Sequence, residues 1–375
     1  MPHPPDPAPS VSGTAAVVGF SGPRCVTVTE EPRQPLVPGS VRVQTLYSGI
    51  SAGTEMTAYR GSNPYLTKHW DADLRLFTTG THSFDYPVSG WGYSEVGTVV
   101  ELSDETGSGA GDLAVADTVY GIWGHRSEAV LPAPPLAGRV LPAGVDPLCG
   151  VFARVGAIAL NAVLAADVHL GEVAAVFGQG VLGLLATRLV TLSGGTVVAI
   201  DSLAPRLGLA RAMGATTVVD AAAGTTAEDV KALVPGGVDV AIEISGSYLA
   251  LQEATRSVCV DGRVVAAGFY QGDGNGLRLG EEFHHNRVRL LASQIGSVAP
   301  GLASRWTTER LHQVFMAQVF AGRMQVAPLV THLVPLSEVR EAYRLLDEEP
   351  ASALQVVLDF RTAGERDAAP NVTSS

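Results

Sequence analysis

The segment Val173–Asp201, VAAVFGQGVLGLLATRLVTLSGGTVVAID, reads as a strand, a glycine-rich turn, a helix and a second strand that leads to an acid. Residues 173–177 form a short apolar run typical of a buried strand, and the helix is expected over about 181–193. The second strand, residues 196–200, places Asp201 near the roughly 20-residue spacing expected of a ribose-binding carboxylate. This order of elements predicts a dinucleotide-binding unit.

Three glycines, Gly178, Gly180 and Gly183, follow the first strand with the spacing G-x-G-x-x-G. The first permits a tight turn, the second lets a pyrophosphate approach the backbone, and the third allows close packing of helix on strand. Because a helix N-terminus attracts phosphate, the first-turn residues Val181 and Leu182 are predicted to lie beside the pyrophosphate.

The acid at the end of the second strand bears on the choice of nucleotide. A carboxylate there accepts hydrogen bonds from the adenosine ribose and repels a 2′-phosphate. Ser202 follows Asp201 where enzymes that use NADP often have a basic residue, and the nearest arginine, Arg206, lies about one helical turn further on. Arg206 is predicted either to cover the adenine or to face solvent. The sequence therefore favours NAD over NADP.

Length and composition limit the classes of protein that fit. The chain has 375 residues, 46% of them hydrophobic and 17% charged, which is enough for two domains. The net charge of −12 and the lack of clustered Lys and Arg argue against a nucleic-acid ligand. We therefore expect a small-molecule substrate.

The cellular location is predicted from the N-terminus, the apolar segments and the cysteines. The first ten residues have neither a basic nor an apolar region, unlike a secretion signal. The apolar stretch 173–192 is broken by Gln179, Arg188 and three glycines, so it is not a membrane span. Three widely spaced cysteines fit a reducing compartment better than a disulfide framework. We expect a cytoplasmic protein that is not bound to a membrane.

The sequence pattern differs between the two halves of the chain. From Thr14 to about Val130, short strands alternate with Gly and Pro, as in an antiparallel barrel. A long connection at 61–88 is rich in aromatic residues, and because long connections are often functional, it is predicted to bind substrate through His69 and Trp70. After Pro147, strands alternate with helices, which predicts a doubly wound parallel sheet.

The predicted fold class is α/β, with a Rossmann domain and a strand-rich barrel domain. The predicted boundaries are a disordered tail at 1–13, a catalytic domain at 14–154, a dinucleotide-binding domain at 155–296, a return to the catalytic domain at 297–360 and a disordered tail at 361–375. The sixth strand of the parallel sheet, VRLLAS at 288–293, is a predicted exposed edge, and we expect it to pair across a two-fold axis in a homodimer.

This organisation resembles the medium-chain dehydrogenase/reductase superfamily across nearly all of residues 14–360. The segment SGISAGTE at 48–55 resembles the place where zinc alcohol dehydrogenases carry a cysteine ligand, and this chain has Ser51 there. In GWGYSEVG at 90–97, Tyr93 stands where those enzymes have a histidine ligand. The third ligand position falls near Ala153, and the four-cysteine structural zinc lobe is missing.

The pairing of these two motifs is similar to a zinc-free branch that includes the bacteriochlorophyllide hydroxyethyl dehydrogenases. The resemblance implies a GroES-like catalytic domain and NAD-dependent interconversion of a secondary alcohol and a ketone without a metal, in specialised metabolism. It also implies that Gly268, Phe269 and Gln294 lie beside the nicotinamide carboxamide.

Without zinc, side chains must handle the proton that an alcohol loses with its hydride. Tyr93 is predicted to donate to the developing oxyanion or to relay its proton, and Ser51 to hydrogen-bond the same oxygen. Glu55 is interpreted either as a base or as a first-turn carboxylate that interacts with the helix dipole. Near the sixth strand, His285 is predicted to contact substrate.

Two other functions fit the same residues. One is reduction of an activated carbon–carbon double bond, with Tyr93 protonating or steadying the enolate. The other is a nucleotide-binding protein that has lost catalysis together with its metal.

Overall fold

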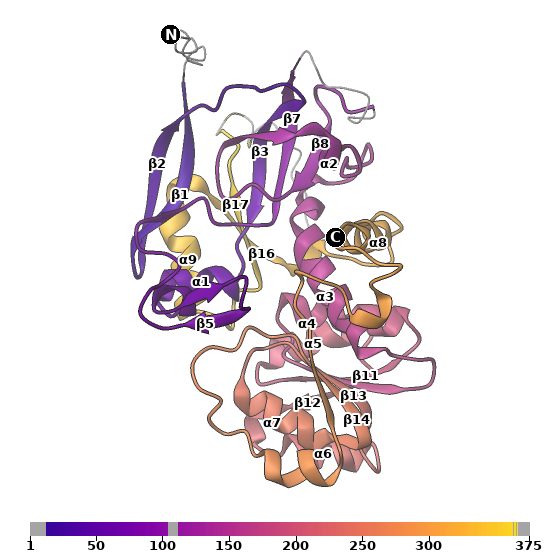
Figure 1. Cartoon of the computed structure of the whole chain (residues 1–375). Helices are drawn as coiled ribbons and strands as arrows, with labels where there is room; N and C mark the ends of the chain where they lie inside the picture. Colours follow the sequence, from indigo (N-terminus) through magenta and orange to yellow (C-terminus); the bar gives the residue numbers. More distant parts are fainter. Residues whose placement is uncertain (1–12, 104–111, 363, 365, 367–375) are drawn as a thin grey trace. The chain divides into compact units, whose positions relative to one another are not determined.

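The computed structural model describes residues 13–103, 112–362, 364 and 366. The chain divides into two compact units (Figure 1). Unit 1 comprises Met1–Phe152 and Val330–Ser375, and unit 2 comprises Ala153–Leu329. Nearly all of the two predicted disordered tails lies outside the described residues.

Unit 2 contains a six-stranded parallel sheet with the order β12-β11-β10-β13-β14-β15. Its strands are β10 (Val173–Phe177), β11 (Thr196–Asp201), β12 (Thr217–Asp220), β13 (Val238–Glu243), β14 (Val258–Ala266) and β15 (Arg289–Ala292). The order reverses between β10 and β13, and in sheets of this kind ligands bind at the carboxyl ends of the strands at that point. The predicted doubly wound α/β fold is confirmed.

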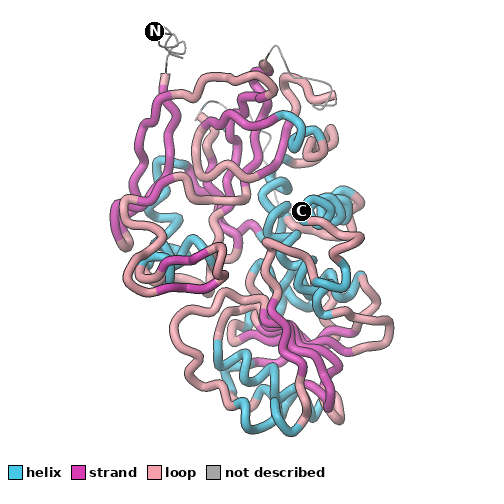
Figure 2. The backbone as a smooth tube through the Cα atoms, viewed as in Figure 1, coloured by secondary structure: helices cyan, strands magenta, loops and turns pink. Residues whose placement is uncertain are grey.

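Helices lie on both sides of this sheet (Figure 2). The helices that follow α2 (Ala133–Ala137) in the chain and precede Val330 are α3 (Phe152–Ala166), α4 (Val181–Leu192), α5 (Ala204–Ala212), α6 (Thr226–Leu233), α7 (Tyr248–Ser257) and α8 (Thr308–Phe320). Because helices cover both faces of the sheet, the central residues of β10, Ala174, Ala175 and Val176, are fully buried. This burial explains why the sequence of β10 is an unbroken apolar run.

One helical segment has the length and apolar composition of a membrane span. Among the described residues, 147–166 is the single segment long and apolar enough to cross a membrane, and 67% of its apolar window is buried within the fold. Core helices have the same composition, so this segment is weak evidence for a membrane span.

Unit 1 is rich in antiparallel strands. The strands are β1 (Thr14–Gly22), β2 (Cys25–Pro32), β3 (Ser40–Gly49), β4 (His69–Asp71), β5 (Leu76–Thr78), β6 (Val88–Ser89), β7 (Glu95–Leu102), β8 (Thr118–Gly121), β9 (Glu128–Pro132), β16 (Val330–Pro335) and β17 (Gln355–Asp359). The helices are α1 (Thr54–Arg60), α2 (Ala133–Ala137) and α9 (Val339–Glu348). The largest sheet has the order β16-β17-β3-β7-β8, with β9 also paired to β3, so the C-terminal strands complete the N-terminal sheet.

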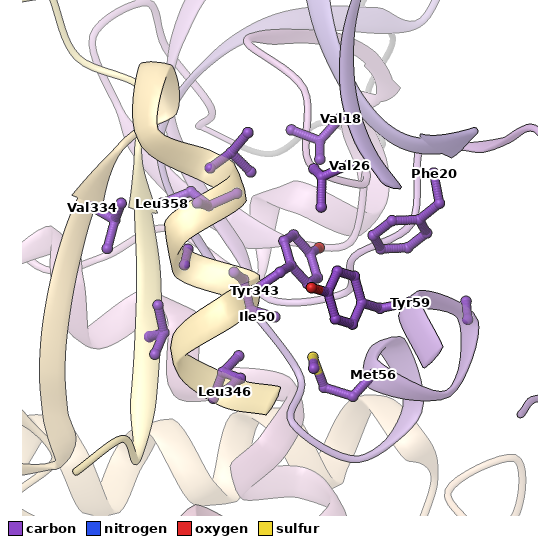
Figure 3. Close-up of a cluster of buried hydrophobic side chains, with 14 of the residues drawn as sticks. Val18, Phe20, Val26, Ile50, Met56, Tyr59, Val334, Tyr343, Leu346 and Leu358 are labelled. Carbon is purple, nitrogen blue, oxygen red and sulfur yellow. The ribbon is translucent and has the colours of Figure 1, made fainter. Parts of the chain in front are cut away.

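Helix α9 closes one core of unit 1. Its buried residues Val339, Ala342, Tyr343 and Leu346 follow the spacing of one helix face. Figure 3 shows the ring of Tyr343 lying against that of Tyr59 from α1, with ring centroids 5.5 Å apart. This packing fixes α1 beside the C-terminal helix.

The return to the first unit begins later than the predicted residue 297. Residues up to Leu329 belong to unit 2, and the return begins at Val330. Helix α8 stays with unit 2 because Phe315 packs directly on Gly156 of α3, where an added Cβ would lie 2.2 Å from the Phe315 ring. The predicted boundaries assigned this segment to the catalytic domain, and the packing of α8 on α3 corrects that assignment.

Strand β15 is at the edge of the parallel sheet, as predicted. All four of its residues are exposed, and Leu290 and Leu291 are each 40% exposed. The pairing of this edge in a homodimer stays a prediction.

Candidate functional site

The glycine turn after β10 forms a cradle at the carboxyl edge of the unit 2 sheet. Gly178 has a φ of 90°, which disfavours any side chain, and a Cβ on Gly183 would lie 1.7 Å from the carbonyl oxygen of Gly178. At Gly180, by contrast, a Cβ would meet nothing closer than the Arg206 guanidinium at 3.9 Å. The space over Gly180 and the N-terminus of α4, where Val181 and Leu182 begin the helix, therefore fits a pyrophosphate.

Asp201 ends β11 beside this turn. Its carboxylate accepts hydrogen bonds from the backbone N–H of Gln179 (2.6 Å) and of Leu203 (2.9 Å). The residue is only 8% exposed. Asp201 therefore shapes the glycine turn, and its role in binding a ribose stays a prediction.

Arg206 lies over the turn rather than out in solvent. Its side chain is partly buried, and one guanidinium nitrogen is the nearest atom to the open face of Gly180. A cation in this position favours binding of an anionic nucleotide.

The other predicted coenzyme residues lie at the same edge of the sheet. Gly268 and Phe269 follow β14, and Gln294 follows β15. Gly268 must be glycine because a Cβ would lie 2.2 Å from the backbone nitrogen of Gly246, in the loop after β13. The loops after β13 and β14 therefore touch beside the place between β10 and β13 where the strand order reverses.

Sequence reasoning missed Glu243, the last residue of β13. Its buried carboxylate accepts hydrogen bonds from the backbone N–H of Ser245 (2.8 Å) and of Gly246 (3.2 Å), and from the hydroxyls of Ser245 and Tyr270. Burial raises the pKa of Glu243 against the opposing effect of these donors. This carboxylate holds the loop that Gly268 contacts.

The predicted role of His285 does not agree with the structure. His285 is exposed and lies four residues before β15, at the amino end of that strand. Since β15 is parallel to the rest of the sheet, this end is opposite the carboxyl edge that carries the glycine turn. The sequence placed His285 near the right strand but at its wrong end.

In unit 1 the structure brings Ser51 and Tyr93 together. Ser51 follows β3 and Tyr93 precedes β7, and these strands pair with Ser48 opposite Glu95. The Ser51 hydroxyl and the Tyr93 phenol are hydrogen-bonded to each other, and both side chains are partly exposed. Two residues 42 positions apart thus form one hydroxyl pair.

Zinc does not fit this pair. Zinc takes Cys, His or carboxylate ligands, and the two positions supply a serine hydroxyl and a tyrosine phenol. Cys149 lies in the turn Pro147–Val151, and burial, with a contribution from Asp146, raises the pKa of its thiol to about 11, so it is a thiol rather than a thiolate near neutral pH. No cluster of three metal-ligating residues is found among the described residues.

Beneath the hydroxyl pair lies a buried chain of polar side chains. His125 contacts Glu55 through Nε2 (2.5 Å) and Ser48 through Nδ1 (2.6 Å). The Ser48 hydroxyl donates to Glu95 (3.0 Å), and the Tyr343 hydroxyl donates to Glu55 (3.2 Å). Each of these five side chains is at most 1% exposed.

Glu55 is therefore not a free base. It lies in the first turn of α1, as the alternative interpretation has it, and its second oxygen accepts the backbone N–H of Ser51 (2.8 Å). His125 was missed in the sequence because its partners are 70, 77 and 30 residues away, and no local motif links them.

Charge and burial oppose each other at His125. Burial lowers the pKa of His125, but the charges of Glu55 and Glu95 and the hydrogen bond to Glu55 raise it above its ordinary value. Burial raises the pKa of Glu95, against the effects of His125 and its backbone donors. The folded protein thus binds protons here more tightly than the unfolded chain does.

We expect the melting temperature to fall as the pH rises above about 6.5. Stabilisation from a raised pKa is complete below the unfolded-chain pKa and is lost as pH rises through the folded-state pKa, by at most about 1.4 kcal/mol per pH unit for one proton. His125→Gln should reduce the dependence of the melting temperature on pH, measured in thermal melts at several pH values. His169→Gln, whose parent side chain is 65% exposed, is the control, and equal slopes in both variants would contradict the assignment.

His69 and Trp70 lie in the β4–β5 hairpin of unit 1 and are partly exposed. Trp70 packs on Phe77, which contacts Tyr65, and the contacts continue through Phe84 to Trp91. Because Trp91 is two residues before Tyr93, this aromatic chain ties the predicted substrate loop to the hydroxyl pair. A substrate-binding role for His69 and Trp70 stays a prediction.

The fold combines a Rossmann nucleotide-binding unit with a GroES-like unit, which is the organisation of a class of oxidoreductases. Residues 181–310 match the family model described as zinc-binding dehydrogenase. This match lies in the nucleotide-binding unit and does not include Ser51 or Tyr93.

Comparisons over the whole chain agree. D-guloside 3-dehydrogenase of Escherichia coli K12 is 25% identical over 349 residues, covering 91% of this chain and 98% of that protein. The 2-desacetyl-2-hydroxyethyl bacteriochlorophyllide A dehydrogenase of Cereibacter sphaeroides is 25% identical over 360 residues, covering 93% and 98%.

Solved structures show the same fold. A Sinorhizobium meliloti protein bound to NADP has a TM-score of 0.72 and 21% identity, covering 93% of this chain and all of that one. An Escherichia coli CFT073 alcohol dehydrogenase complexed with NADH has a TM-score of 0.72 and 17% identity, with the same coverage. These similarities support the resemblance of the chain to the medium-chain dehydrogenase/reductase superfamily.

Proposed function

We propose that this protein is a zinc-independent, NAD(H)-dependent oxidoreductase that interconverts a secondary alcohol and a ketone. The observation that carries the proposal is the Ser51–Tyr93 hydroxyl pair, which occupies the two positions where the resemblance places zinc ligands. Relatives named as dehydrogenases of a guloside and of a hydroxyethyl bacteriochlorophyllide support alcohol oxidation as the reaction type.

The residues of unit 2 fit a nicotinamide dinucleotide. The glycine cradle and the N-terminus of α4 would hold its pyrophosphate, Asp201 its adenosine ribose, and the loops at Gly268 and Gln294 its carboxamide end. When bound, the coenzyme supplies the hydride acceptor.

In unit 1, the phenol and the serine hydroxyl handle the oxygen of the substrate. Tyr93 accepts or donates the alcohol proton, and Ser51 hydrogen-bonds the same oxygen as charge develops on it. The partly exposed phenol is reached by a ligand, whereas Glu55 and His125 beneath it are fully buried.

Metal content tests the zinc-independent part of the proposal. We expect the purified protein to contain far less than one zinc per chain by elemental analysis, and its turnover of secondary alcohols with NAD to survive prolonged dialysis against a chelator. Stoichiometric zinc, or activity that is lost on chelation and restored by zinc, would overturn this part of the proposal.

Asp201 tests the preference for NAD. Asp201→Ala should weaken NAD binding about tenfold more than NADP binding, because the substitution removes a charge that attracts the ribose hydroxyls and repels a 2′-phosphate. The ratio of the two dissociation constants is the informative quantity, since damage to the glycine turn lowers both affinities alike. Exposed Ser202→Ala is the matched control, and an unchanged ratio in Asp201→Ala would contradict the ribose assignment.

A further inference from the structure

The buried chain Glu55–His125–Ser48–Glu95 contains three consecutive contacts, and each needs a hydrogen. They are His125 Nε2 to Glu55 (2.5 Å), His125 Nδ1 to the Ser48 hydroxyl (2.6 Å), and the Ser48 hydroxyl to Glu95 (3.0 Å). A neutral imidazole and one hydroxyl bring two hydrogens. With both carboxylates ionised, one contact would then join two lone pairs in a site that water does not reach.

A third proton removes this conflict. It makes His125 an imidazolium that donates from both ring nitrogens, or it protonates Glu95, which then donates to Ser48, which in turn donates to His125, or it protonates Glu55, which then donates to His125 Nε2. The other donors to Glu95 are the backbone N–H groups of Ser94 (3.1 Å) and Trp123 (2.7 Å), and those to Glu55 are the backbone N–H of Ser51 (2.8 Å) and the Tyr343 hydroxyl (3.2 Å). These donors favour ionised carboxylates and hence the imidazolium.

The chain is connected to the hydroxyl pair through Glu55. One Glu55 oxygen accepts from His125 and Tyr343, and the other accepts from the backbone N–H of Ser51. The Ser51 hydroxyl in turn contacts Tyr93. The titratable groups that face His125 come from Glu55 on α1 and Glu95 on β7, with Tyr343 of α9 reaching it through Glu55.

Gly92 shows how closely the chain packs under Tyr93. A Cβ on Gly92 would lie 2.8 Å from a carboxylate oxygen of Glu95 and 2.9 Å from His125 Nδ1. The residue next to Tyr93 therefore rests directly on the two groups that share the extra proton.

We propose that Glu55, His125, Ser48 and Glu95 share one extra proton at neutral pH, held on the ring of His125 as an imidazolium, and that in this form His125 is a positioning residue that fixes Ser51 against Tyr93. The importance of the pair for turnover rests on the proposed function, whereas the shared proton and the fixed Ser51 do not. Loss of the proton leaves one buried contact without a hydrogen, so the chain rearranges and the anchor of Ser51 weakens.

The protonation state is tested on the wild-type full chain by nitrogen NMR of its histidines. We expect the His125 ring to carry protons on both nitrogens at pH 7. The His125 signal is identified by its loss in His125→Gln. A neutral His125 ring at pH 7 would overturn the shared proton, whatever the protein's activity.

Two variants of His125 separate its contacts. Gln keeps a donor near the position of Nε2 and so retains the Glu55 contact, while Asn keeps a donor near Nδ1 and so retains only the Ser48 contact. The Ser51 amide proton, hydrogen-bonded to a carboxylate, should resonate far downfield in the wild type and in His125→Gln, and should move upfield in His125→Asn. Equal shifts in the two variants would overturn the positioning role.

Turnover provides the functional test on any secondary alcohol that the wild type oxidises. His125→Asn should lower kcat by about a hundredfold, as misplacement of a reacting group by about 1 Å does, with little change in the KM for NAD. His125→Gln should stay within about tenfold of the wild type and lose the decline of kcat at high pH. If the wild type oxidises no alcohol while both NMR results hold, the proposed function fails and the buried proton stands.

Discussion

Replacing Tyr93 by phenylalanine is expected to lower turnover of secondary alcohols by about 10²- to 10⁴-fold while leaving NADH affinity unchanged. Loss of a positioned acid–base group has an effect of this size, and we propose the phenol as the acid–base group of the partly exposed hydroxyl pair. The ring itself remains, so packing around it should not change. Steady-state kinetics and fluorescence titration with NADH measure the two quantities separately.

Tyr65→Phe is the matched control for this prediction. Tyr65 belongs to the aromatic chain of the same unit and contacts Phe77 and Phe84 through its ring, which the substitution keeps. We expect its turnover to remain within a few-fold of the wild type. If Tyr93→Phe behaves like Tyr65→Phe, then Tyr93 only packs in the site and the proposed chemistry is wrong.

Two glycine substitutions in the turn after β10 should have opposite effects on stability and binding. Gly183→Ala places a Cβ 1.7 Å from the carbonyl oxygen of Gly178, so we expect it to destabilise the fold by about 1–3 kcal/mol or more. Gly180→Ala places a Cβ where the nearest atom is 3.9 Å away, so its melting temperature should match the wild type. The open space over Gly180 is nevertheless where the pyrophosphate would lie, and NADH affinity should fall about 10- to 100-fold.

Thermal melts and NADH titrations on both variants test the predicted losses of stability and of NADH affinity. A Gly180→Ala protein that is stable and binds NADH as tightly as the wild type would show that the coenzyme does not approach this turn. Because this variant leaves the apoprotein undisturbed, its loss of affinity is not explained by unfolding.

The fold class and the coenzyme edge could be predicted from the sequence because their signals are local. The strand, turn, helix and second strand of residues 173–201 lie consecutively, and the parallel order then fixes where the carboxyl ends meet. The two errors have different causes. His285 precedes β15 in the chain and so lies at the amino end of that parallel strand, opposite the edge that binds ligands, and the predicted role neglected this rule. The domain of α8 depends instead on a tertiary contact, that of Phe315 with Gly156.

The unit 1 site was only partly predictable. Ser51, Glu55 and Tyr93 were found because they occupy motif positions of a known superfamily. His125, Ser48, Glu95 and Tyr343 have no such motif, and they meet because β3 pairs with β7 and α9 packs on α1.

By itself, the amino-acid sequence determined that this protein has a glycine-rich turn with an acid after it, and that serine and tyrosine stand where the resemblance places metal ligands. Those features are fixed by residue identity and by spacings of a few tens of residues. Only the tertiary structure decided that Glu55 is engaged by three donors and that a buried histidine lies between two carboxylates. The physical reason is that protonation and positioning depend on contacts most of which join residues 47 to 288 positions apart, and strand pairing and helix packing create these contacts.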